Sequence, residues 1–144
     1  MKKRVALVTL VAGTVVMTGT IGIRGAASRI ERTIALGQDE QGQCIVTASP
    51  TLIRSAKRNF RIVWNVVNQC QEPVTVGVGN FKLKRNNRPG NPLELGSSPT
   101  VPAGGTSRLE GRVKVLPSSQ LGTYKYDILL DGTVAVDPEL EVDG

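Results

Sequence analysis

The sequence predicts an all-β protein, a single antiparallel or mixed β-sandwich of about seven strands that is preceded by a signal-peptide helix. Several observations support this prediction. Apolar and polar residues alternate with a period of two in several short segments, which is typical of half-buried strands. Turn-forming residues recur at intervals of about ten residues, and no segment after residue 27 has the pattern of a long helix. Aromatic residues make up only 3% of the chain, so we expect an aliphatic core.

Residues 1–27 have the composition of a secretory signal peptide. Residues 2–4 are basic, residues 5–23 are uncharged and mostly apolar, and residues 25–27 are small, so we expect cleavage after Ala27. The alternative is an uncleaved membrane anchor, since about 19 residues can just span a bilayer. Threonines and glycines dilute the apolar stretch and favour cleavage. In both cases the domain is exported to the periplasm or the extracellular space.

Residues 28–43 are predicted to form a flexible or partly helical linker. Ser28 and Glu31 have the spacing of a helix capping box, and Ile30 and Ile34 lie four residues apart. Gly37 can end a short helix. We therefore place the β-sandwich domain at residues 44–144.

Cys44 and Cys70 are the only cysteines, and export permits a disulfide between them. Two separate thiols are the alternative, because the sequence does not show a strand pairing that brings them together. A redox role is disfavoured, because the spacing is not C-x-x-C.

The first strands are expected between residues 44 and 83. Residues 44–48 and 51–54 form two short strands. Residues 60–67 form the strongest central strand, in which every second residue is large and apolar, and Trp64 is expected in the core. In residues 74–83 the apolar positions change from even to odd around Asn80, which predicts a β-bulge or bend there.

The remaining strands are separated by strong turn signals. Residues 86–92 and 96–105 are predicted to be loops on either side of a brief edge strand, residues 93–95. In the next strand Leu109, Gly111, Val113 and Val115 face one way, and Arg108, Glu110, Arg112 and Lys114 face the other. Gly111 leaves a gap for a larger neighbour. The last strands are then expected at residues 124–130, 133–136 and 140–142. Asp131-Gly132 predicts a two-residue hairpin turn between the first two of these.

Charge and composition exclude several functions. Four of the 18 basic residues lie in residues 1–27 and all 12 acidic residues follow, so the remainder carries 14 basic and 12 acidic residues, a net charge of +2. A charge this small gives no case for nucleic-acid binding. The chain has no histidine, which excludes the usual Ser-His-Asp and Cys-His nucleophile arrangements and histidine zinc sites.

Two stretches resemble cupredoxin-like domains. The first is Phe60-Arg61-Ile62-Val63-Trp64-Asn65, with Pro50 between the strands that precede it. The second is Gly122-Thr123-Tyr124-Lys125-Tyr126-Asp127, which is similar to the penultimate strand that leads into the copper ligands of that family. Immunoglobulin-like Greek-key sandwiches share much of this pattern. The resemblance implies the fold but not electron transfer, because Asp127 stands near the expected ligand cysteine and histidine is absent.

Two basic groups are candidates for contact with a polyanion. They are Arg54, Lys57, Arg58 and Arg61, followed by Lys82, Lys84, Arg85 and Arg88. If they converge, they can bind an anionic surface such as lipopolysaccharide, nucleic acid or an acidic glycan. The alternative is a solvated face, with lysines that protect an edge strand. A less favoured candidate is a calcium site formed by the acidic C-terminal group of Asp131, Asp137, Glu139, Glu141 and Asp143.

The sequence therefore predicts an exported, non-enzymatic module that acts as a binding or structural domain of the cell envelope. No catalytic residue, cofactor or metal site is predicted, and copper is excluded as a partner. The expected partner is a protein or envelope component of unknown identity. Membrane attachment is expected only if the signal segment stays uncleaved. The residues expected to matter most are structural: Cys44, Cys70, Trp64, Tyr124 and Tyr126.

Overall fold

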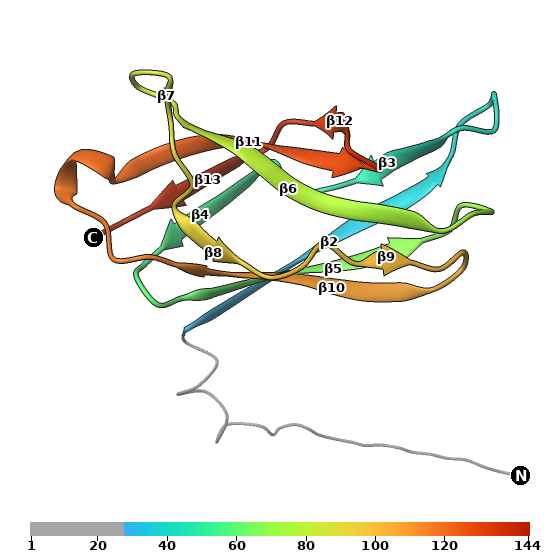
Figure 1. Ribbon diagram of the computed structural model, residues 1–144, viewed down its shortest axis with the longest axis horizontal. Helices are drawn as coiled ribbons and strands as arrows, with labels where there is room; N and C mark the ends of the chain where they lie inside the picture. Colours follow the sequence, from blue (N-terminus) through green and yellow to red (C-terminus); the bar gives the residue numbers. More distant parts are fainter. Residues whose placement is uncertain (1–27) are drawn as a thin grey trace, which may run out of the picture.

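Two β-sheets lie face to face in a computed structural model of the chain, which describes residues 28–144 (Figure 1). The predicted signal peptide lies outside the described residues. The only helical element in the described part is a 3-10 turn at Ser118–Gln120, and no helix there has the length and hydropathy to cross a membrane. The prediction of an all-β sandwich with mixed strand directions is confirmed.

One sheet has five strands in the order β3-β2-β5-β10-β8. Their bounds are β2 Arg29–Gln38, β3 Cys44–Ala48, β5 Arg61–Asn68, β8 Leu93–Leu95 and β10 Thr106–Val113. The β2 strand runs parallel to β5, and the other neighbours are antiparallel. This sheet carries the candidate site described below.

The other sheet has seven strands, with a main path β4-β13-β11-β6-β7 and with β12 and β9 paired to β11 and β6. Their bounds are β4 Leu52–Ala56, β6 Val74–Leu83, β7 Arg88–Pro89, β9 Thr100–Val101, β11 Gly122–Leu130, β12 Thr133–Val136 and β13 Glu139–Val142. The described residues form twelve strands, more than the predicted total of about seven. Nine of them correspond to segments expected to be strands. The β2 strand was not expected, and the two-residue strands β7 and β9 lie in stretches predicted to be loops.

The prediction that residues 28–43 form a flexible or partly helical linker is wrong, and the sandwich begins at Arg29 rather than at residue 44. Eight residues of β2 pair in register with β5. Ile34 and Leu36 are fully buried, at a spacing of two. Residues 29–38 form a strand because pairing with β5 provides backbone hydrogen bonds and burial. These outweigh the capping-box pattern, which is only a weak local preference for a helix.

An aromatic group joins the two sheets across the core. Trp64 on β5 and Tyr126 on β11 have ring centroids 5.9 Å apart in an edge-to-face arrangement. Phe81 on β6 stacks on Tyr126 at 5.2 Å. Trp64 Nε1 donates a hydrogen bond to Tyr126 Oη at 3.3 Å, and both residues are fully buried, which confirms Trp64 as a core residue.

The β6 strand has the predicted irregularity. Gly79 pairs with Asp127 and Lys82 with Lys125, so two residues of β6 oppose one of β11. Asn80 adopts φ 55° at this bulge. The extra residue moves the buried positions from even to odd numbers, so that Val78 and Phe81 both face the core.

The turn and the disulfide expected from the sequence are both present. Asp131 and Gly132 have φ 50° and 84° between paired residues Leu130 and Thr133, as a type I′ hairpin turn requires. Cys44 and Cys70 form a disulfide with Cα atoms 5.7 Å apart. The bridge ties the start of the edge strand β3 to the segment after β5.

Candidate functional site

Three arginines lie side by side on the outer face of the five-stranded sheet. Arg61 on β5 is the register partner of Arg29 on β2 and of Arg112 on β10. Neighbouring strands are about 4.8 Å apart, so the row spans about 10 Å. We call Arg29, Arg61 and Arg112 the arginine row. Like charges in directly opposite positions are destabilising, so fold stability alone does not favour this arrangement.

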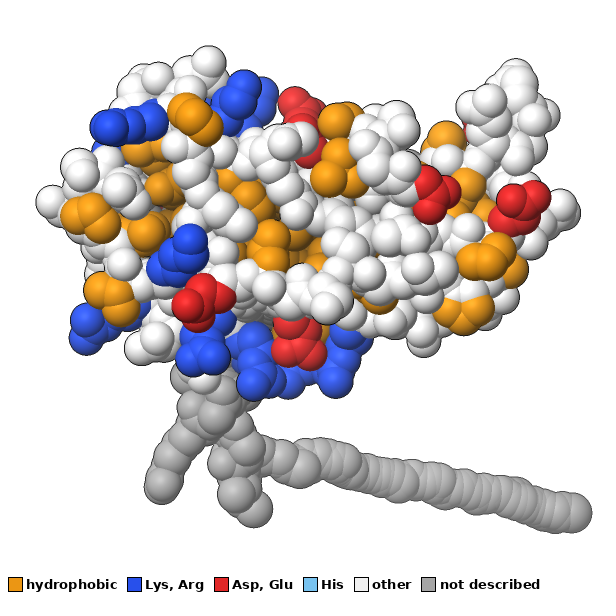
Figure 2. All heavy atoms as spheres, in the orientation of Figure 1, with side chains coloured by type: hydrophobic (Ala, Val, Ile, Leu, Met, Phe, Trp, Pro, Cys, Tyr) orange, Lys and Arg blue, Asp and Glu red, His pale blue; other side chains and the backbone are white. Residues whose placement is uncertain are grey.

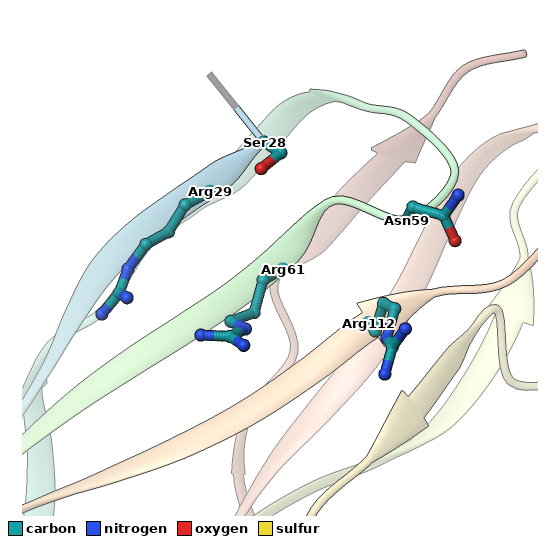
Figure 3. A pocket seen from close by; sticks show the side chains of 5 residues that line it. All are labelled: Ser28, Arg29, Asn59, Arg61 and Arg112. Atoms are coloured by element: carbon teal, nitrogen blue, oxygen red, sulfur yellow. The ribbon is translucent and has the colours of Figure 1, made fainter. Parts of the chain in front are cut away.

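The arginine row opens on a hollow of about 370 Å³ at the end of the sheet (Figure 3). Its lining consists of the arginine row, Ser28 and Asn59. The described part of the lining therefore carries three guanidinium groups, a hydroxyl and an amide, with no carboxylate. All of these groups can donate hydrogen bonds, so the hollow suits an anion.

Backbone hydrogen bonds fix the walls of this hollow. The Arg61 amide donates to the Ser28 carbonyl at 2.8 Å, which holds the start of β2 against β5. Asn59 adopts φ 67° in the turn before β5, and its amide donates to the Val113 carbonyl at 2.9 Å. The lining residues thus belong to the sheet or to a turn bonded to it, which limits the cost of ordering the site on binding.

Three carboxylates lie close to the row. Glu94 on β8 is the register partner of Arg112, and Glu31 and Glu110 lie two residues from Arg29 and Arg112 on their strands. Arg29 Nε forms an ion pair with Glu31 Oε2 at 2.8 Å. Arg61 Nε is 3.7 Å from Glu110 Oε1, a loose ion pair between largely exposed groups. The Arg112 side chain forms no ion pair or hydrogen bond within residues 28–144. The row is therefore incompletely neutralised.

A hydrogen bond holds Glu31 in its ionised form beside the row. Asn65 Nδ2 donates to Glu31 Oε1 at 3.1 Å. This bond, together with the positive charge of Arg29, lowers the pKa of Glu31 below its ordinary value. Glu31 therefore stays charged at neutral pH and compensates part of the charge of Arg29, whereas Arg112 lacks such a partner.

Figure 2 shows basic side chains gathered along the lower margin of the molecule, where Figure 1 places β5 and β10, with acidic side chains among them. The two predicted basic groups do not form one patch, since Arg61 lies on the five-stranded sheet and Lys82 on the other. Within the first group, Arg54 lies on β4, and Lys57 and Arg58 are exposed in the following turn. Only Arg61 lines the hollow.

The second basic group is partly occupied by contacts within the molecule. Lys84 Nζ is 2.8 Å from Glu139 Oε2. The Arg85 guanidinium donates to the carbonyls of Ser119 and Leu121. Lys82 and Arg88 are exposed at the edge formed by β6 and β7, where cations also discourage strand pairing with another molecule. We therefore place the candidate site at the arginine row.

The acidic C-terminal group is dispersed, and the calcium alternative is not supported. Asp137 faces Lys125 at 3.5 Å, Glu139 pairs with Lys84, and Glu141 accepts a bond from the Ser55 amide at 3.1 Å. Asp131 accepts from the Thr75 amide at 2.9 Å. Residues 28–144 contain no group of three or more carboxylate or cysteine side chains placed to hold a metal ion.

The sequence analysis missed Arg29 and Arg112 as site residues. Arg112 was recognised only as part of the polar face of its strand, and Arg29 was assigned to the linker. One sequence feature could have pointed to the site. Arg29, Arg61 and Arg112 are each adjacent in sequence to an apolar residue that faces the other side of its strand. Their convergence depends on the parallel pairing of β2 with β5, which the sequence does not reveal.

The residues of this chain do not fit a blue-copper centre. Such a centre uses two histidines and a cysteine thiolate. The chain has no histidine, and both cysteines are joined in the disulfide. Asp127 lies near the position where the cupredoxin resemblance would place a ligand cysteine. Its carboxylate accepts a hydrogen bond from Asn80 Nδ2 at 2.8 Å.

Comparison with solved structures identifies the fold. The multicopper oxidase McoA of the hyperthermophile Aquifex aeolicus superposes with a TM-score of 0.51 at 10% identity, over 81% of this chain and 30% of the oxidase. A multicopper oxidase of Campylobacter jejuni superposes with a TM-score of 0.45 at 13% identity, over 81% of this chain and 26% of the oxidase. The blue copper oxidase of Nitrosomonas europaea superposes with a TM-score of 0.40 at 16% identity, over 80% of this chain and 38% of the oxidase.

No protein-family model matches the chain, and no curated protein is similar to it in sequence. The chain spans about a third of the length of these oxidases, and at such low identity the likeness to McoA shows the fold alone. Multicopper oxidase domains are cupredoxin-like sandwiches. The protein is therefore a cupredoxin-like β-sandwich that lacks the copper ligands.

Proposed function

We propose that the chain is an exported, non-enzymatic binding module that holds an anionic component of the cell envelope at its arginine row. The observation that carries the proposal is the hollow lined by three arginines from adjacent strands, with no carboxylate in its lining. Guanidinium groups bind oxyanions through paired hydrogen bonds. Export is supported by the composition of residues 1–27 and by the disulfide, which is typical of proteins in oxidising compartments.

Retention on immobilised heparin tests this function against general surface charge. The triple variant Arg29→Gln/Arg61→Gln/Arg112→Gln removes the row. The triple variant Arg54→Gln/Lys57→Gln/Arg58→Gln removes the same charge from the predicted group that does not reach the hollow. We expect the first variant to bind heparin roughly a hundredfold more weakly, because it loses three charge-assisted contacts, and the second to stay close to the unmodified protein.

The binding should also weaken with added salt, because the hollow is open to solvent. Circular dichroism and melting temperature check that both variants remain folded. Equal losses in the two variants would show that retention follows net charge alone. Retention that neither variant changes would refute the arginine row as the binding site.

A further inference from the structure

We infer that the hollow takes a phosphate-type oxyanion and that the amino terminus produced by signal-peptide removal completes the site. The inference rests on the proposed function, since it assumes export and binding at the arginine row. It names the chemical class of ligand and makes binding depend on processing. The observation behind it is that Ser28, the first residue after the expected cleavage position, lines the hollow beside Arg29 and Arg61.

The sheet holds the backbone of Ser28 at the hollow. Its carbonyl accepts the Arg61 amide at 2.8 Å, and the next residue, Arg29, begins β2 and pairs with Arg61. In the unprocessed chain the Ser28 nitrogen is a neutral peptide amide. Cleavage after Ala27 converts it into an α-amino group, which is largely protonated at neutral pH because such groups ordinarily titrate near pH 8. Processing therefore adds one positive charge to a residue that lines the same hollow as the arginine row.

The donors at the hollow match a tetrahedral oxyanion better than a single carboxylate. Arg29, Arg61 and Arg112 come from three adjacent strands, so three separate guanidinium groups are available to the oxygens of one anion. The side-chain amide of Asn59 and the hydroxyl of Ser28 are the neutral donor groups in the lining (Figure 3). A phosphate group offers at least three acceptor oxygens and up to two negative charges, whereas a carboxylate offers two oxygens and one charge.

The test compares proteins that differ at the terminus or at one arginine. The reference is the exported protein, with Ser28 verified as its first residue by mass spectrometry. Three variants are prepared: one with a Gly-Ser extension before Ser28, Arg112→Gln, and Lys57→Gln as a control with the same charge change as Arg112→Gln. Calorimetry measures binding of inorganic phosphate and pyrophosphate. Sedimentation measures binding to phosphatidic acid vesicles, with phosphatidylcholine vesicles as the uncharged comparison.

We expect the reference and Lys57→Gln to bind these phosphate probes alike. The extended protein and Arg112→Gln should each bind at least about tenfold more weakly, because each loses a charged donor. Binding to vesicles and to free phosphate would both support a site for the phosphate group itself. Binding to phosphatidic acid vesicles alone would identify membrane-borne phosphate as the source.

The outcomes separate this inference from the proposed function. If the extended protein binds as well as the reference while Arg112→Gln does not, the terminus plays no part, and the arginine row stands as the binding site. An exported protein that begins at another residue would also overturn the role of Ser28. If Arg112→Gln and Lys57→Gln bind equally, or if no phosphate probe binds, phosphate recognition at the row is wrong. The heparin comparison then decides whether the row binds any polyanion.

Discussion

Asn68 is the only buried polar residue of the described core, and it organises the segment that carries Cys70. Its side-chain amide donates to the carbonyls of Glu72 and Val101, each at 3.0 Å. Its side-chain oxygen accepts the Cys70 amide at 2.9 Å. One side chain thus satisfies backbone groups from both ends of the β5–β6 connection and from β9.

We expect Asn68→Ala to lower the free energy of unfolding by about 2–4 kcal/mol, because it leaves buried backbone groups without partners. Chemical denaturation of the oxidised protein measures the change. Gln69→Ala, at the exposed neighbouring position, is the control. A loss below about 0.5 kcal/mol for Asn68→Ala would show that water replaces these hydrogen bonds.

The ionisation of Tyr126 makes the stability of the folded protein depend on pH in the alkaline range. Burial raises its pKa to about 12, although the hydrogen bond from Trp64 opposes this shift. The unfolded chain, with an ordinary tyrosine pKa of about 10, releases its proton first as the pH rises. The neutral side chain therefore contributes its full stability below about pH 10, and this contribution is lost between about pH 10 and pH 12, by roughly 3 kcal/mol in total.

Denaturation at several pH values from 9 upward measures this loss. Tyr126→Phe provides the comparison, because it differs from the unmodified protein only in lacking the phenol group at this position. We expect a steeper fall with pH for the unmodified protein than for the variant. Parallel curves for the two proteins would contradict the assignment to Tyr126.

Single residues differ in how well the sequence predicts their place. Trp64 and the pair Cys44 and Cys70 were predicted correctly, because bulk and chemistry restrict where they can lie. Arg112 was placed correctly on the polar face of its strand. Its neighbours across the sheet were not predictable, because contacts between strands depend on register, which no local pattern specifies.

At the scale of elements, the disulfide secures a weakly held edge strand. The β3 strand pairs only with the last residues of β2, and the ladder shifts register between Ala35 and Leu36. Cys44, the first residue of β3, is bonded to Cys70 at a sequence separation of 26. A bridge of this span restricts the unfolded chain by about 3.5 kcal/mol on the chain-entropy model.

The double variant Cys44→Ala/Cys70→Ala should therefore unfold at lower denaturant, with a free energy of unfolding reduced by about 3.5 kcal/mol. Hydrogen exchange should increase most at the amides of β3, because that strand has only one partner. Unchanged stability would show that the unfolded state is already constrained without the bridge.

The strands that the sequence predicts well are those with strict alternation and clear ends. The β10 strand is one of them, and Leu93 and Leu95 fill the space beside Gly111, where an added Cβ would lie 3.0 Å from Leu95. The β2 strand was missed, because Arg32 interrupts its apolar alternation and Ile30 and Ile34 also suit a helix. Its identity comes from parallel pairing with a strand about thirty residues away, a non-local interaction that overrides local preference.

Across the whole molecule, the proposed function depends on how the sheets distribute charge. Residues 28–144 carry 14 basic and 12 acidic residues, so no strong overall field attracts an anion. The hollow concentrates three guanidinium groups because β2, β5 and β10 align them in one row. The cupredoxin-like sandwich serves here as a rigid support for that row, in a chain without the ligands for copper.

An NMR titration tests whether the arginine row binds anions. Uniformly ¹⁵N-labelled processed protein is titrated with pyrophosphate at low salt, and backbone amide shifts are followed. We predict saturable shifts at Arg29, Asn59, Arg61 and Arg112. Shifts centred on Lys82–Arg88, or the absence of saturable shifts anywhere, would contradict the account.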